Sequence, residues 1–247
     1  MTSQRTRVEL KTATTLLEQQ WETMRSWLGR IVDDDDAAGL DAVLAAPGVL
    51  PGYTVADVIS YIGRTLDVLA LTDPAEPGVL PLSLAEYLGA YRDRSESAAR
   101  AGRQYAAEIS PAPLRALDRI ASAAFHRITE LGPDDRVVQT RRAPIMLSGL
   151  VVSRLIELVM YGDDLGRSVA WPGAHPVNVD ALSYAAEALL GIVVARGGWS
   201  LEVADPLLWV RLATGRMPYE VDRLAKALQA RFTSDSVPDL GLMLPLL

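Results

Sequence analysis

The segment RLIELVMYGDDLGR, at residues 154–167, restricts the fold of this chain more than any other stretch. Arg154, Glu157, Tyr161 and Asp164 follow one another at steps of three, four and three residues in an otherwise apolar run. Such steps bring side chains to one face of an α-helix, whereas a strand would alternate them between two faces. The spacing therefore predicts a helix that is largely buried and carries a narrow polar stripe.

Apolar residues at helical spacing recur along the chain and predict further amphipathic helices. The pattern indicates helices over residues 6–31, 54–71, 84–109, 114–131, 179–196 and 218–232, and places the start of the polar-striped helix near 147. It also indicates a short extended piece within 137–140 and a strand at 199–203. Long amphipathic helices joined by moderate loops are typical of an up-down bundle whose working groups point inward or toward one open end.

A break rich in proline and glycine, with Pro172, Gly173 and Pro176, interrupts this helical pattern. We therefore expect a mainly α protein in two parts: a helical bundle at residues 1–170 and a small C-terminal α/β domain at 177–247.

Composition narrows the class of partner. The formal net charge of -7, with no block of Lys and Arg, argues against nucleic acid and anionic membrane surfaces as partners. The chain has no cysteine, which excludes disulfides, thiolate metal sites and a cysteine nucleophile. Its beginning lacks the apolar core of a signal peptide, and no apolar run reaches the roughly 18 residues of a membrane span. We expect a cytoplasmic protein that binds a small molecule or a protein, and the oligomeric state stays open.

Four consecutive aspartates at 33–36 have two interpretations. They could hold a cation, but consecutive side chains point in different directions, so a solvated acidic loop is favoured. The only histidines, His126 and His175, are expected on a helix surface and in a loop, without a catalytic role.

Three motifs together carry a family resemblance: PGYTVADVISYIG at 51–63, RLIELVMYGDDLGR at 154–167 and DPLLWVRLATGR at 205–216. They resemble the mycothiol-dependent maleylpyruvate isomerase family of the DinB-like superfamily. The resemblance implies a DinB-like bundle in which two histidines and one glutamate hold a divalent metal, usually zinc. It also implies the low-molecular-weight thiol mycothiol as a cofactor, and an actinobacterial setting. A metal-bound thiol loses its proton near neutral pH and becomes a nucleophile for isomerisation or S-transfer.

Carried over residue by residue, the resemblance places Glu157 at the glutamate ligand and places Tyr61 and Tyr161 at the two histidine ligands. A phenol has a pKa of about 10 and must lose its proton to bind a metal well, whereas imidazole offers a neutral lone pair. We therefore expect no bound metal or other cofactor. We expect instead a hydrogen-bonded cluster of Tyr61, Glu157 and Tyr161 with Arg154 as the charge partner.

Three uses of this cluster stay open. It could stabilise the core, or it could retain a metal. It could also line a pocket together with Asp57, Arg154 and Asp164. In that pocket Glu157 would act as catalytic base and Tyr61 or Tyr161 as proton donor. Two functions follow: a thiol-dependent isomerase or S-transferase with a lost or altered metal site, or a non-catalytic protein that binds a small ligand or another protein. The substrate cannot be derived from these motifs.

Overall fold

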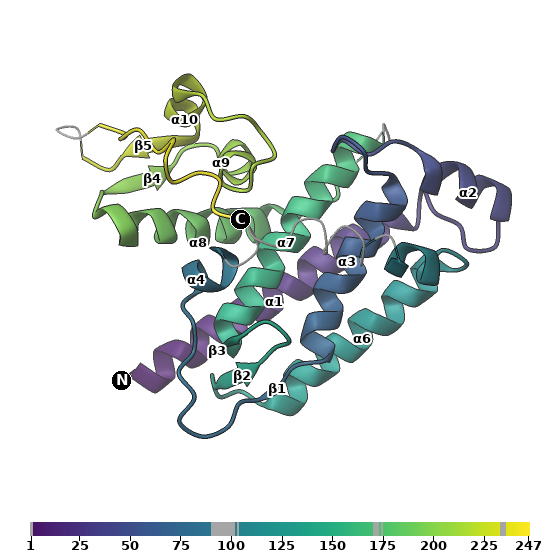
Figure 1. The fold of residues 1–247 in the computed structure, drawn as a ribbon, viewed down its shortest axis with the longest axis horizontal. Coiled ribbons are helices and arrows are strands. Elements are labelled where there is room, and N and C mark those ends of the chain that lie inside the picture. Colours follow the sequence, from purple (N-terminus) through teal and green to yellow (C-terminus); the bar gives the residue numbers. More distant parts are fainter. Residues whose placement is uncertain (1, 90–101, 103, 170–172, 174, 233–235) are drawn as a thin grey trace.

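Four long helices build the main part of the molecule. The structure, a computed structural model, describes residues 2–89, 102, 104–169, 173, 175–232 and 236–247. The bundle consists of α1 (Thr2–Leu28), α3 (Val55–Ala70), α6 (Pro113–Leu131) and α7 (Leu147–Ser168) (Figure 1). Helix α7 packs against α1 and α3, and α3 packs against α6. The predicted mainly α fold is confirmed.

Helix α3 begins where the sequence predicts it. Thr54 accepts a hydrogen bond from the Asp57 backbone, and the Asp57 carboxylate accepts one from the Thr54 backbone at 2.8 Å, which forms a capping box. Its buried face then carries Val58, Ile62 and Leu66, which are no more than 1% exposed. This face holds α3 against α6 and α7 by apolar contact.

A small antiparallel sheet closes one end of the bundle (Figure 1). Its order is β1 (Asp73–Pro74), β2 (Val137–Gln139) and β3 (Pro144–Met146). The extended piece predicted within 137–140 is confirmed as β2. The helix predicted over 84–109 is present as α4 (Leu84–Gly89) and as helical turns at 104–109, while 90–101 and 103 lie outside the described residues.

The acidic run leads into α2 (Ala37–Ala45), a helix that the sequence analysis missed. Asp36 caps α2 by accepting from Gly39 N at 3.1 Å. Asp34 accepts from the backbone amides of Leu114 and Arg115, at 3.1 and 2.9 Å, in the first turn of α6. The expectation of a solvated loop is therefore wrong for Asp34, whose side chain is 7% exposed. Its carboxylate accepts hydrogen bonds from amides in the first turn of α6, which have no acceptor within the helix.

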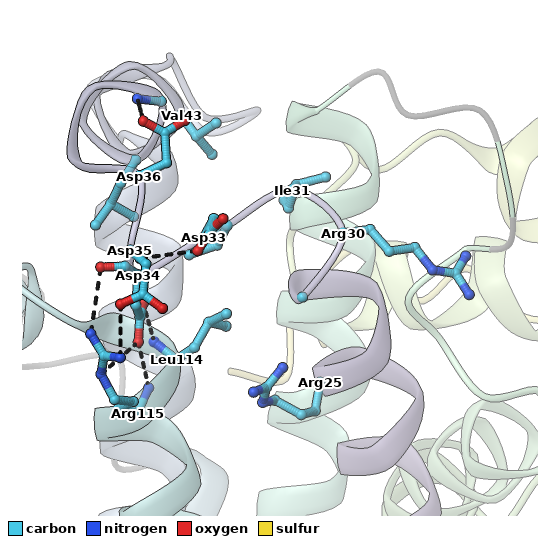
Figure 2. Close-up of a pocket in the computed structure, with 14 residues that line it drawn as sticks. Arg25, Arg30, Ile31, Asp33, Asp34, Asp35, Asp36, Val43, Leu114 and Arg115 are labelled. Carbon is cyan, nitrogen blue, oxygen red and sulfur yellow. Dashed lines mark hydrogen bonds and ion pairs between the residues drawn. The ribbon is translucent and has the colours of Figure 1, made fainter.

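A cavity of about 600 Å³ lies beside this loop, with Asp34 and Asp35 turned toward Arg115 (Figure 2). The Arg115 guanidinium lies 3.2 Å from Asp35, and Arg25 on the facing helix makes its own ion pair with Asp118 at 2.6 Å. The acidic run is thus engaged in helix capping and ion pairs.

The C-terminal part packs on α7 through α8 (Val179–Gly197). Strands β4 (Leu201–Val203) and β5 (Leu228–Ala230) pair antiparallel, with α9 (Pro206–Ala213) and α10 (Val221–Ala227) between them in sequence (Figure 1). The strand predicted at 199–203 is confirmed in its second half. The helix predicted to run to 232 is wrong: α10 ends at Ala227, since the next residues make their backbone hydrogen bonds to β4. No helix in the described ranges is both long enough and apolar enough to cross a membrane.

Candidate functional site

Two tyrosines meet between α3 and α7. The Tyr61 and Tyr161 rings stack with centroids 5.6 Å apart and an interplanar angle of 18°. Tyr53 tilts against Tyr61 at 6.0 Å, Arg64 lies 5.6 Å from the Tyr61 centroid, and Arg216 lies 5.9 Å from the Tyr161 centroid. The two tyrosines therefore form an aromatic layer with a cation near each ring.

The Glu157 carboxylate is buried in the same interface. Its Oε2 accepts a hydrogen bond from Thr65 Oγ1 at 2.8 Å and lies 3.0 Å from Nη1 of Arg154. Glu157 is 4% exposed and Arg154 is 2% exposed, so water screens this pair little. The expected charge partner is in place. The sequence analysis missed Thr65, although its position four residues after Tyr61 put it on the same face of α3.

Burial also affects the phenol of Tyr61. Desolvation raises the pKa of Tyr61 to about 12, and its hydrogen bond with Tyr53 adds to the rise. The phenol therefore keeps its proton throughout the physiological pH range. Gly102 lies against this ring, and a Cβ there would come within 3.0 Å of the Tyr61 hydroxyl oxygen, so a larger residue would press on the cluster.

The next part of the polar stripe joins α7 to the C-terminal part. The Asp163 carboxylate accepts hydrogen bonds from Nε and Nη2 of Arg211, at 2.8 and 2.6 Å. Asp164 lies 2.8 Å from Arg167 and 3.0 Å from Arg216. Burial raises the pKa of the Asp164 carboxyl, and Arg216 and Arg167 oppose that rise. Asp163 and Asp164 thus form an ion-pair network between α7 and the C-terminal part.

A cavity of about 350 Å³ opens on the other side of Arg154. Of the three residues expected to line a pocket, Arg154 lines this one and Asp57 and Asp164 do not. The physical reason is that Asp57 closes the capping box of α3, whereas Asp164 binds the arginines. Glu157, Tyr61 and Tyr161 are also outside the lining of this cavity, so Arg154 separates it from the carboxylate.

The two histidines differ in their surroundings. His126 is 73% exposed on α6 beside Glu130, and His175 Nε2 lies 3.6 Å from Asp163. Across the part of the chain that the structure describes, no three His, Asp or Glu side chains are grouped so that they could hold a metal ion.

Comparison with known proteins identifies the family. Residues 17–166, which include α3, most of α7 and the tyrosine pair, match the model of the mycothiol maleylpyruvate isomerase N-terminal domain. The chain belongs to this family. The fold is similar to that of a structure described as the crystal structure of the mycothiol-dependent maleylpyruvate isomerase, with a TM-score of 0.55 and 16% identity over 93% of this chain and 95% of that one. No curated protein matches the chain.

Proposed function

We propose that this member of the mycothiol maleylpyruvate isomerase family works without a divalent metal and binds a small molecule rather than catalysing metal-dependent thiol chemistry. The observation that carries the proposal is the stack of Tyr61 on Tyr161 beside the buried Glu157. In this proposal the two tyrosines occupy the positions at which the family resemblance would place histidine ligands.

The residues present do not fit the zinc ion that the resemblance implies. Burial raises the pKa of Tyr61 to about 12 in the metal-free chain, so a divalent ion would have to displace a firmly held proton before this phenol could bind it as an anion. Two tyrosinates and a carboxylate would also bring about three negative charges to one ion, a donor set that suits ferric iron better than zinc.

The surroundings of Glu157 support binding over catalysis. Thiol-dependent isomerisation or S-transfer in this family would depend on a metal to deprotonate the thiol. A metal-free mechanism with Glu157 as base and Tyr61 or Tyr161 as donor would need contact between substrate and the carboxylate. Glu157 is 4% exposed and is held by Arg154 and Thr65. The catalytic role of Glu157, Tyr61 and Tyr161 stays a prediction, and the burial of Glu157 weighs against it.

A zinc titration of histidine variants tests the proposal. The purified wild-type chain and Y61H/Y161H are titrated with zinc by calorimetry, with Y184H/Y219H as a control that adds two histidines elsewhere. We expect about one zinc per chain in Y61H/Y161H alone, because Glu157 supplies the third ligand. Stoichiometric zinc in the wild type would contradict the proposal. A folded Y61H/Y161H without zinc would show that the tyrosines do not stand at ligand positions.

A further inference from the structure

The 350 Å³ cavity concentrates positive charge in an acidic protein. Four arginines line it, Arg64 from α3, Arg154 from α7, and Arg141 and Arg142 from the turn between β2 and β3. Two carboxylates, Asp67 and Glu108, also line it, and Arg154 is paired with the buried Glu157 at 3.0 Å, so four arginines minus three carboxylates leave a formal charge of +1. The whole chain carries -7. A local excess of cations in a concave site attracts an anion.

The turn that presents two of these arginines is firmly held. Thr140, which is 5% exposed, accepts from the backbone amides of Arg142 and Ala143 at 3.1 and 3.2 Å and donates to the Ala143 carbonyl at 2.9 Å. Tyr87 on α4 donates to the same hydroxyl at 3.3 Å. The turn is therefore fixed to α4, and the guanidinium groups are positioned before a ligand arrives.

Aromatic and apolar surface forms the rest of the cavity wall. The Tyr87 ring is 1% exposed and has Arg142 5.2 Å and Arg154 5.9 Å from its centroid, so it supports these two cations and offers little surface to a ligand. Tyr105, Val68 and Leu71 add further apolar lining. Burial raises the pKa of Tyr105 to about 12, so this phenol stays neutral. Such a wall suits a flat ligand that stacks on tyrosine and guanidinium faces.

Size and charge restrict the ligand further. A volume of about 350 Å³ lies at the small end of ligand pockets, which range over about 300–1,000 Å³. The planar guanidinium matches a carboxylate with two parallel hydrogen bonds. A phosphate dianion fits less well, because Asp67 and Glu108 would repel its second charge.

We propose that this cavity, walled by Arg64, Arg141, Arg142, Arg154, Tyr87 and Tyr105, is a binding site for a small aromatic carboxylate. The inference rests on the proposed function, because it names the class of small molecule that the protein would bind. The ring of the ligand stacks on the partly exposed Tyr105 and on the guanidinium faces, and the carboxylate binds the arginines of the turn.

Calorimetric titration with benzoate as the probe tests this proposal. The full chain is titrated in parallel with benzoate, the aliphatic dicarboxylate succinate and inorganic phosphate. The variant R141Q/R142Q removes the two turn arginines, and R141Q alone leaves the contact between Arg142 and Tyr87 intact. The control R196Q/R231Q changes the net charge as R141Q/R142Q does, at exposed positions outside the cavity.

We expect one benzoate per chain, bound more tightly than succinate or phosphate. The affinity for benzoate should fall about tenfold or more in R141Q/R142Q and less in R141Q, because charge-assisted hydrogen bonds to the carboxylate are lost. It should be unchanged in the control R196Q/R231Q. Absence of benzoate binding, preference for phosphate or succinate, or an equal loss in R196Q/R231Q would overturn the proposal. The zinc titration tests the tyrosine and Glu157 site, whereas the benzoate titration tests the cavity. A wild type that binds both zinc and benzoate would therefore refute the proposal that the protein works without a metal, but it would support the proposed ligand site in the cavity.

Discussion

Replacing Arg154 by methionine should reveal how strongly the buried carboxylate depends on its counter-charge. Methionine keeps the apolar bulk of the side chain but leaves Glu157 with Thr65 and without the guanidinium at 3.0 Å. Both side chains are at most 5% exposed, so solvent weakens the attraction between the two charges very little. Removing one partner of such a pair costs about 3–5 kcal/mol, because the remaining charge stays buried.

Urea unfolding followed by circular dichroism measures this loss. With a slope of about 3 kcal/mol per molar urea, the midpoint of R154M should fall by about 1–2 M. The double variant R154M/E157Q removes the stranded charge and keeps an acceptor for Thr65, so it should recover most of the loss. As a matched control, R231M breaks an ion pair whose side chains are 60% and 41% exposed and should cost less than about 1 kcal/mol. A loss in R154M as small as that in R231M would refute the reasoning.

Three further perturbations test other parts of the structure. D34A removes the acceptor of the first amides of α6 and should lower the free energy of unfolding in urea by about 1 kcal/mol. The control D35A changes an aspartate that is 84% exposed and should lower it less. Equal losses in the two variants would contradict the capping role of Asp34. D163N should weaken the contact of α7 with Arg211 and lower the free energy of unfolding by about 1.5–3 kcal/mol. An unchanged melting temperature would argue against a stabilising ion-pair network between α7 and the C-terminal part. The pKa of Tyr61 is raised from 10 in the unfolded chain to about 12 in the folded chain, so the wild type should lose stability as pH rises from about 10 to 12. Unfolding curves recorded over this pH range should show a steeper loss for the wild type than for Y61F. Parallel pH profiles of the two proteins would rule this out.

Long, regular patterns made the helices of the bundle predictable from sequence. In α7 the apolar residues and the polar stripe follow helical spacing over the whole helix. The start of α3 is marked in the sequence by the capping residues Thr54 and Asp57. The boundary between α10 and β5 could not be predicted in this way. Leu224 and Leu228 fit a helical spacing, but the strand forms because a partner more than twenty residues earlier pairs with it.

The candidate site was predictable only in part. The approach of Tyr61 to Tyr161 and the charge pair of Arg154 with Glu157 follow from helical spacing once the two helices are placed side by side. The cavity does not follow from spacing, because Arg141 and Arg142 reach it from a turn whose position depends on Thr140 and on α4. Long-range packing, which no local pattern encodes, brings these arginines to Arg154.

Metal content of the wild-type chain tests the central claim most directly. The protein is purified without chelator, equilibrated with zinc, passed through a desalting column and measured by elemental analysis. Because the stacked Tyr61 and Tyr161 offer phenols in place of imidazole and the pKa of Tyr61 is raised to about 12, zinc should remain far below one per chain. About one zinc per chain that is lost in E157Q would contradict the account.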